Sequence, residues 1–256
     1  MLKRKIEKYF DEEVSDLADA LRCIDEVFSL LNTGEIRVSE KIAKKWKVNT
    51  WIKKAILLGF KLREASEQDL DSFDKFGLLK YNYANPRYRK VPFAIIRNGV
   101  YIGDNAVIMP SCINIGAYIG NDSMVDMNAT IGSCAQIGER CHIAASSCIG
   151  GVLEPLIENP VIVEDNCFIG ANSALLEGVI VEEGSVIAAG VSISASTRII
   201  DRSTGNVSYG IVPLGSVVVS GSYPSNGINI ACAVVVKKVD AKTMAKSSFN
   251  EILRGI

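Results

Sequence analysis

The sequence lacks several features on which whole functional classes depend. It contains one histidine, His142, so a zinc site built from several histidines of a single chain is excluded. The formal net charge is −1, which gives no indication of a nucleic-acid partner. No apolar run reaches the roughly 18 residues that a membrane-spanning helix needs, and residues 1–13 are rich in charge and contain no apolar signal core. We therefore expect a cytoplasmic protein with no nucleic-acid or membrane partner.

Metal-binding cysteine motifs are also missing. The chain has seven cysteines, yet no CxxC or CxxH motif occurs. An odd number of cysteines without a secretion signal favours reduced thiols over a disulfide framework. We expect Cys134, Cys141 and Cys148 to serve packing as small residues, with a redox or metal role as the alternative. No metal site is predicted.

What the sequence does contain is a repeat of six residues. From residue 95 to residue 149 every sixth position is apolar, and from the third of these onward the position two before it holds a small residue. A period of six fits neither an α-helix nor a simple strand, and hexapeptide repeats are typical of parallel β-helices. The positions predicted to point into the core are Ile95, Tyr101, Val107, Ile113, Ile119, Val125, Ile131, Ile137, Ile143 and Ile149.

The repeat is interrupted once and then resumes. Residues 151–160 contain two prolines and fit no hexad, so we predict a loop that leaves the β-helix at a corner. Three hexads would form one triangular coil, inside which branched aliphatic side chains stack. We therefore predict a β-helix over residues 93–200. Its second set of inward positions is Val163, Ile169, Leu175, Val181, Ile187, Ile193 and Ile199.

The segments on either side of the repeat have other patterns. Apolar residues at helical spacing predict one helix over residues 5–31 and another over about residues 50–62, capped by Asn49 or Thr50. Residues 1–63 are therefore predicted to form a small helical domain, and residues 64–92 a connector that lies across a surface. Residues 201–256 are predicted to form a C-terminal extension with a hairpin at 201–210, further strands and a short terminal helix.

Several longer strings carry a more specific signal. SMVD (123–126), ATIGSCAQIG (129–138), EDNCFIGA (164–171), EGVIVEEGSVI (177–187) and VVVKKVDAKT (234–243) resemble the 2,3,4,5-tetrahydropyridine-2,6-dicarboxylate N-succinyltransferase family, and the likeness extends over nearly the whole chain. The resemblance implies a left-handed parallel β-helix and a cytoplasmic homotrimer of lysine and diaminopimelate biosynthesis. It also implies transfer of a succinyl group from succinyl-CoA to the amino group of the ring-opened substrate. CoA would then be a co-substrate, with no permanently bound cofactor.

The resemblance also assigns roles to individual residues. Arg89, in RKVP, matches the family's substrate-binding arginine, whose planar fork suits a carboxylate. Asp126, in SMVD, matches the family's active-site aspartate and is the candidate to bind the substrate and to orient or deprotonate its amine. Secondary candidates are His142 and Glu177 for catalysis, and Ala189, Gly190, Lys237 and Lys238 for CoA.

The chain departs from the family's pattern near the expected site. Asn128 stands where tryptophan is usual, and Asn172 and Ala174 stand where the family has an arginine and its catalytic glutamate. Ala145, Ser146 and Cys148 occupy glycine positions, which would narrow a pocket. Glu177 is the nearest acid to Ala174 along the chain, but half a face separates them, so direct replacement is not expected.

Three functions are compatible with this pattern. The first is the succinyl transfer that the family performs. The second is a paralogous N-acyltransferase, for example one that uses acetyl-CoA and a related amino acid, because both an arginine and a carboxylate have been replaced. The third is a non-catalytic trimeric scaffold, against which the intact strings EGVIVEEGSVI and VVVKKVDAKT argue.

Overall fold

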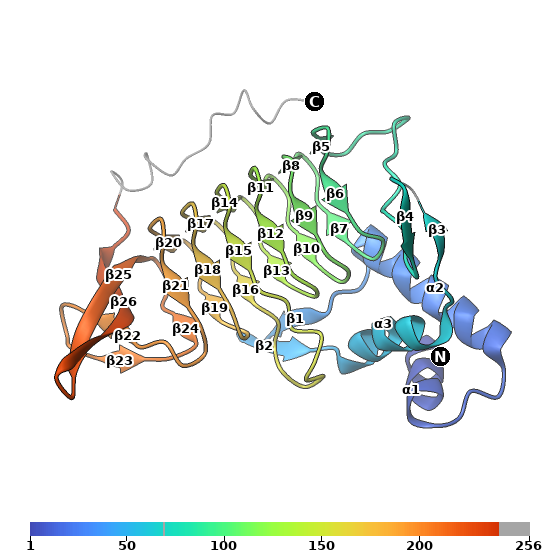
Figure 1. The fold of residues 1–256 in the computed structure, drawn as a ribbon, viewed down its shortest axis with the longest axis horizontal. Helices are drawn as coiled ribbons and strands as arrows, with labels where there is room; N and C mark the ends of the chain where they lie inside the picture. Colours follow the sequence, from blue (N-terminus) through green and yellow to red (C-terminus); the bar gives the residue numbers. More distant parts are fainter. Residues whose placement is uncertain (69, 241–256) are drawn as a thin grey trace.

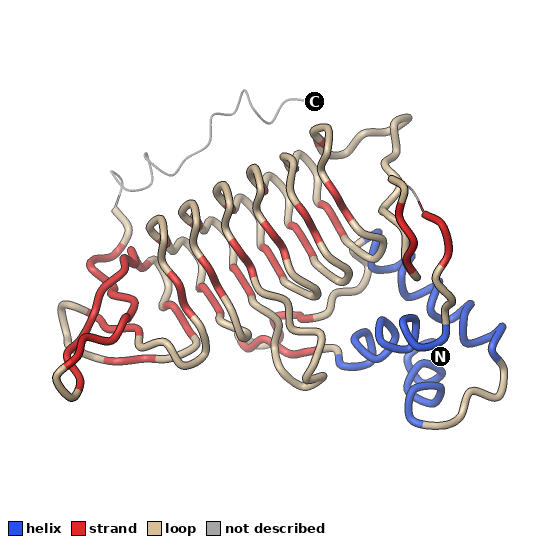
Figure 2. Tube along the Cα trace, viewed as in Figure 1, coloured by secondary structure: helices blue, strands red, loops and turns tan. Residues whose placement is uncertain are grey.

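The computed structural model describes residues 1–68 and 70–240, and its centre is a three-sided prism of short parallel strands (Figure 1). Each coil contributes a two-residue strand to each side, and the strands are joined by turns at the corners (Figure 2). Among the described residues there are three α-helices, all at the N-terminal end. The predicted fold class, a mainly β protein with hexapeptide repeats and a small N-terminal helical region, is confirmed.

We number the sides of the prism as faces and name each corner by the two faces that it joins. Face 1 consists of β6 (Ile95–Ile96), β9 (Cys112–Ile113), β12 (Thr130–Ile131), β15 (Cys148–Ile149), β18 (Ala174–Leu175) and β21 (Ser192–Ile193). Face 2 consists of β7 (Tyr101–Ile102), β10 (Tyr118–Ile119), β13 (Gln136–Ile137), β16 (Ile162–Val163), β19 (Ile180–Val181) and β24 (Ile211–Val212). Face 3 consists of β5 (Arg89–Lys90), β8 (Val107–Ile108), β11 (Met124–Val125), β14 (His142–Ile143), β17 (Phe168–Ile169) and β20 (Val186–Ile187), and it continues into β25 (Ser216–Ser225), β26 (Ile228–Lys238), β22 (Ile199–Asp201) and β23 (Val207–Ser208).

Inward-facing side chains form the core of the prism. From residue 113 to 149 and from residue 163 to 199, every position predicted to point inward is at most 1% exposed. Parallel register keeps these columns aligned, since each strand pairs with its equivalent one coil later. The predicted register is therefore confirmed over most of the repeat.

Before residue 113 the predicted register is wrong by one position. Ile95, Tyr101 and Val107 lie on the outer side of the sheets, and Ile95 is 39% exposed. The corner between β8 and β9 is one residue shorter than the corners on either side of it, which shifts the frame of every residue before it. The residues that face inward there are Ile96, Ile102 and Ile108.

The N-terminal part contains two helices where one was predicted over residues 5–31. α1 (Leu2–Asp11) ends well before α2 (Leu17–Thr33) begins. The break lies at Asp16, because its side chain caps α2 by accepting a hydrogen bond from Asp19 N at 2.9 Å. The Asp19 carboxylate then accepts hydrogen bonds from Lys5 Nζ at 2.9 Å and Tyr9 Oη at 2.7 Å, which holds α1 against α2.

A hairpin of β1 (Ser39–Ile42) and β2 (Lys45–Val48) attaches this part of the chain to face 2 (Figure 1). The Glu164 carboxylate accepts hydrogen bonds from Lys41 Nζ at 2.6 Å and from Trp46 Nε1 at 2.7 Å. Burial alone would raise the pKa of Glu164, yet these donors hold it below its ordinary value. The Arg37 guanidinium also lies over the Tyr118 ring, 3.6 Å from its centroid. The chain itself therefore covers face 2.

α3 (Thr50–Leu62) holds the loop that interrupts the repeat. Lys53 of this helix is fully buried, and its Nζ donates to the carbonyl oxygens of Glu158 at 2.7 Å and Pro155 at 3.3 Å. Asn49 precedes the helix, but its side chain donates to Arg37 O and does not cap the helix. The loop after β15 is thus fixed to the N-terminal part and does not hang free.

Both ends of the prism are covered by non-repeat segments. After the hairpin of β3 (Ser66–Gln68) and β4 (Ser72–Asp74), the chain crosses the mouth of the first coil, where the Tyr81 and Tyr88 rings meet at 5.1 Å. β5, at Arg89, already belongs to that coil although it lies within the segment predicted as a connector. At the far end, β22 and β23 form the expected hairpin, and β25 pairs with β26 over their whole lengths. The predicted terminal helix lies outside the described residues, and no helix within 1–68 or 70–240 is long and apolar enough to span a membrane.

Candidate functional site

Asp126 and His142 come together on face 3. Asp126 follows β11 directly, and His142 opens β14, which pairs with β11 in parallel register so that His142 lies beside Met124. The Nε2 atom of His142 lies 3.6 Å from the Asp126 Oδ2 atom. The other carboxylate oxygen, Oδ1, accepts a hydrogen bond from Met127 N at 2.7 Å, which fixes the carboxylate in its turn.

The surroundings of His142 favour its neutral form. The edge of the ring meets the Phe168 ring of β17 at a centroid distance of 5.0 Å. Burial lowers the pKa of His142 below its ordinary value, while the Asp126 carboxylate partly opposes this effect. The imidazole is therefore neutral at pH 7 and can accept a proton.

Arg89 lies on the same face as Asp126 and His142. It is the first residue of β5, and the order of strands in the sheet is β5, β8, β11, β14. Its backbone N donates to Ala106 O at 2.9 Å, which fixes β5 against the next coil. The fold thus brings a half-buried guanidinium, a carboxylate and an imidazole to one surface from three separate coils.

Corner 3–1, which follows each face 3 strand, carries most of the positions at which the sequence departs from the family pattern. The turns stack through backbone hydrogen bonds, for example from Ser146 N to Met127 O at 2.8 Å and from Gly190 N to Ala171 O at 2.9 Å. The stacked residues with positive φ at this corner are Asn128, Ser146, Asn172 and Gly190. Ala189 is exposed beside Gly190, so these two CoA candidates lie along the same corner as Asp126.

The other candidates lie elsewhere. Glu177 is at corner 1–2, where its Oε2 accepts a hydrogen bond from Ala195 N at 3.1 Å. Lys238 Nζ donates to Leu214 O at 2.6 Å at corner 2–3, and Lys237 Nζ pairs with Asp240 at 2.7 Å. The structure therefore does not bring Glu177 to Asp126, and it separates the two lysines from Ala189 and Gly190 by the width of face 3.

Phe168 was not among the residues predicted for the site, yet it lies beside His142. Its ring forms one wall around His142, and it occupies the outer position of β17, one coil after His142 on β14. The hexad register could have identified it, because it precedes the inward Ile169 as His142 precedes the inward Ile143. Within the described part of the chain, no group of three or more histidine, cysteine, aspartate or glutamate side chains could hold a metal ion.

Comparison with known proteins gives a consistent result. Family models match the tetrahydrodipicolinate N-succinyltransferase N-terminal region at residues 1–62, the bacterial transferase hexapeptide repeat at 116–151, and the hexapeptide repeat of succinyl-transferase at 160–195. A crystal structure of a putative 2,3,4,5-tetrahydropyridine-2-carboxylate N-succinyltransferase from Campylobacter jejuni has a TM-score of 0.61 at 18% identity, over 84% of this chain and 62% of that one, which shows a shared fold.

Curated relatives are much closer in sequence. The 2,3,4,5-tetrahydropyridine-2,6-dicarboxylate N-succinyltransferase of Acinetobacter baylyi is 51% identical over 93% of this chain and 90% of the relative. The enzyme of the same name from Sodalis glossinidius is 47% identical over 100% of this chain and 98% of the relative. That from the Wolbachia of Brugia malayi is 52% identical over 90% of this chain and 88% of the relative. The chain is therefore an acyltransferase that belongs to the 2,3,4,5-tetrahydropyridine-2,6-dicarboxylate N-succinyltransferase family.

Proposed function

We propose that this enzyme transfers a succinyl group from succinyl-CoA to the amino group of ring-opened tetrahydrodipicolinate, in lysine and diaminopimelate biosynthesis. The family membership supports the donor and the acceptor. The observation that carries the chemistry is the contact between Asp126 and the neutral His142 on face 3, at 3.6 Å. We also propose that the enzyme works in the cytoplasm.

The pair at Asp126 and His142 supplies what the reaction needs. The amine can attack the thioester carbon only after it has lost its proton, and a carboxylate or neutral imidazole at this place can receive that proton. Asp126 orients or deprotonates the amine, and His142 is the second acceptor beside it. As the C–N bond forms and the C–S bond breaks, the proton is passed on to the leaving CoA thiolate. Backbone N–H groups along the corner stabilise the oxyanion that forms on the thioester oxygen.

The acceptor and CoA bind at different places on face 3: the acceptor at its first strand, β5, and CoA at corner 3–1. The Arg89 guanidinium binds a carboxylate of the acceptor, because its fork matches carboxylate geometry. CoA lies along corner 3–1, where the small residues Ala189 and Gly190 allow a close approach to the backbone. Lys237 and Lys238 would meet the CoA phosphates only if the nucleotide end reaches corner 2–3, where these lysines lie.

We also propose that the enzyme is a homotrimer, as the family resemblance implies. Face 2 is covered by the chain's own N-terminal part, so association must use the other two faces. Near corner 3–1 several apolar side chains are exposed: Phe93 is 89% exposed, Met127 49% and Ile95 39%. Exposed apolar side chains gathered along one corner are typical of an interface. Light scattering at the mass of a single 27.7 kDa chain would contradict the trimer.

A second candidate function is transfer of a neutral acyl group such as acetyl. One observation favours it: among the described residues at corner 3–1 and on the outer side of face 1, no arginine or lysine is available to bind the distal carboxylate of a succinyl group. The outer residues nearest to the corner are Thr130, Cys148, Ala174 and Ser192 on face 1, and Ala145, Ser146 and Asn172 at the corner itself.

An acyl-CoA panel distinguishes these functions. The purified enzyme is given succinyl-CoA or acetyl-CoA with tetrahydrodipicolinate or 2-aminopimelate, and the released thiol is measured. The proposal expects the highest kcat/KM with succinyl-CoA. Faster transfer from acetyl-CoA would establish the second candidate, and no thiol release with any combination of donor and acceptor would contradict acyl transfer altogether.

A further inference from the structure

A hollow that plays no part in the proposed reaction lies at the N-terminal mouth of the prism. It has a volume of about 510 Å³ and is bounded by the end of α2, by residues 78–88 and by the first coil. This volume is within the range of about 300–1,000 Å³ that is usual for small-molecule sites. Arg89, Asp126 and His142 are not among the residues that line it.

Two asparagines that line this hollow, Asn82 and Asn98, have an NH₂ group to offer as a donor. The Asn32 Oδ1 accepts from Gly99 N at 2.7 Å, and the Asn32 Nδ2 donates to Asn98 Oδ1 at 2.8 Å. The Asn82 Oδ1 accepts from Ala84 N at 3.1 Å. With their oxygens occupied, Asn82 and Asn98 keep their NH₂ groups for another partner, and an NH₂ group can only donate.

The charged side chains that line the hollow are also hydrogen-bond donors. No acidic residue lines it, while Lys80 and Arg87 both do. Arg87 is already paired with Asp104 at 2.5 Å, whereas the Lys80 ammonium has no ion pair or hydrogen bond with any described residue. The surplus of positive charge in the hollow is therefore at Lys80.

Tyr88 is the feature that marks the hollow as a site. The residue is only 9% exposed and lines the hollow, yet its hydroxyl has no hydrogen bond within the described part of the chain. Burial raises the pKa of Tyr88 to about 12, so the hydroxyl remains a proton donor at any physiological pH. The Tyr88 hydroxyl is therefore an unused donor in the lining of the hollow, available to a ligand there.

We propose that this hollow binds a small aliphatic carboxylate, held by the Lys80 ammonium, the NH₂ groups of Asn82 and Asn98, and the Tyr88 hydroxyl. A carboxylate offers only acceptors to these donors. The apolar side chains of Leu78, Leu79 and Ile102 line the rest of the hollow and give the aliphatic part of the ligand its contact. The site is separate from the proposed acceptor site, and the proposal does not depend on the enzyme's activity.

Calorimetry with glutarate tests this proposal. The titration is done in an Arg89→Ala background, so that the carboxylate does not bind at the acceptor site. Glutarate is expected to bind with one site per chain. Lys80→Ala should weaken binding by about tenfold or more, because a hydrogen bond to a charged group is lost, and Tyr88→Phe should weaken it by several-fold.

Matched controls make the result decisive. Tyr83→Phe removes a hydroxyl from the same segment, but Tyr83 is 86% exposed and does not line the hollow, so the affinity should not change. Inorganic phosphate, which has the charge but no aliphatic part, should bind more weakly than glutarate. The proposal is overturned if glutarate gives no saturable heat, or if Lys80→Ala and Tyr88→Phe bind it as well as the parent does.

Discussion

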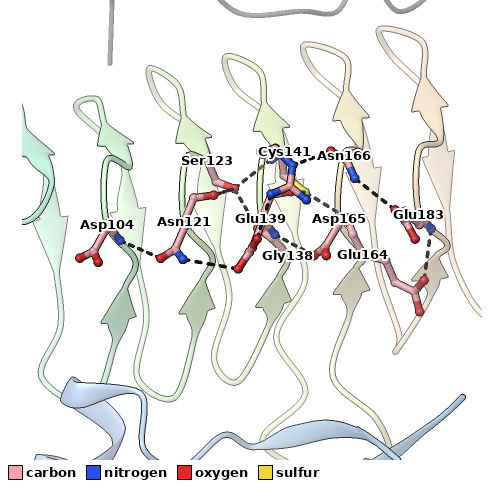
Figure 3. Close-up of polar contacts among 11 residues, drawn as sticks. Asp104, Asn121, Ser123, Gly138, Glu139, Cys141, Glu164, Asp165, Asn166 and Glu183 are labelled. Atoms are coloured by element: carbon pink, nitrogen blue, oxygen red, sulfur yellow. Dashed lines mark hydrogen bonds and ion pairs between the residues drawn. The ribbon is translucent and has the colours of Figure 1, made fainter. Parts of the chain in front are cut away.

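Corners 2–3 and 3–1 of the prism have the same stacked turns but very different side chains. At corner 2–3 the polar side chains bond to one another and to the backbone of neighbouring coils (Figure 3). Asn121 Oδ1 accepts from Asp104 N at 2.9 Å, Asp165 Oδ1 accepts from Glu139 N at 2.8 Å, and the ladder continues to Glu183. At corner 3–1 the turns stack through backbone hydrogen bonds, and the side chains are mostly small and neutral.

Under the proposed function, the difference separates a structural corner from a reactive one. Side chains that are satisfied by the neighbouring coil stabilise the prism but are not available to a ligand. Where alanine, serine and glycine replace them, the backbone stays accessible, and the single carboxylate of Asp126 is left facing its imidazole partner. Substitutions at corner 2–3 should therefore change stability. Matched substitutions at corner 3–1 and on the outer side of face 3 should change catalysis.

The largest expected effect comes from Asp126→Asn. Removing the carboxylate that we propose to orient or deprotonate the amine should lower kcat by about 10²–10⁴-fold, measured as thiol release. The control is Asp104→Asn at corner 2–3, where Asp104 pairs with Arg87, and it should leave kcat unchanged. If both variants were fully active, Asp126 would have no catalytic role, and attention would turn to His142.

The next largest effect is expected for Arg89→Ala. Losing a hydrogen-bonded cation should cost about 1.5–3 kcal/mol, or roughly 10- to 150-fold in the KM of the acceptor, with little change in the KM of acyl-CoA. Arg140→Ala is the matched control, because Arg140 bonds to Glu139 and Asn166 at corner 2–3. An unchanged acceptor KM in Arg89→Ala would remove this residue from the site.

A smaller effect, on stability, is expected at corner 2–3. Asn121→Ala leaves Asp104 N without its acceptor and should lower the free energy of unfolding by about 1 kcal/mol. Ser146→Ala at corner 3–1 should change it by less than about 0.5 kcal/mol, since its side chain is exposed and makes no hydrogen bond with the described residues. Urea denaturation followed by fluorescence measures both, and equal losses would mean that the two corners do not differ in this way.

The smallest effect is a shift in the pKa of His142. As the protein's single histidine, it gives an isolated NMR titration. The midpoint should lie below the ordinary value of 6.5, and it should fall further in Asp126→Asn, because the neighbouring carboxylate favours the charged ring. The unfolded chain takes up this proton more readily, so stability is full above pH 6.5 and decreases as the pH falls toward the folded pKa. A midpoint above 6.5 would show that attraction to Asp126 outweighs burial.

Much of the fold could be predicted from the hexad, because one inward residue per strand fixes which positions face the core. The first three inward positions were misplaced, since a corner shortened by one residue leaves no mark in a pattern of similar apolar residues such as Val107 and Ile108. The break in the N-terminal helix was missed because Val14 maintains the apolar spacing while Asp16 forms the cap. Three hexads in each coil place Asp126 and His142 in adjacent coils, as the structure has them. The contact of His142 with Phe168 depends in addition on how the repeat resumes after the loop at 151–160, which the hexads before the loop do not fix.

The covered ends of the prism have a consequence for solubility. A row of parallel strands ends in unpaired N–H and C=O groups that could template another chain and let molecules join end to end. Here Leu79 N donates to Ile96 O at 2.8 Å, and Leu78 bridges Arg97, so a non-repeat segment occupies the first edge of face 1. At the other end face 3 continues through β25, β26 and β22, and it ends at the short strand β23, which pairs antiparallel with β22. The repeat is thereby limited to the length of one molecule, and the chain avoids growing into a fibre.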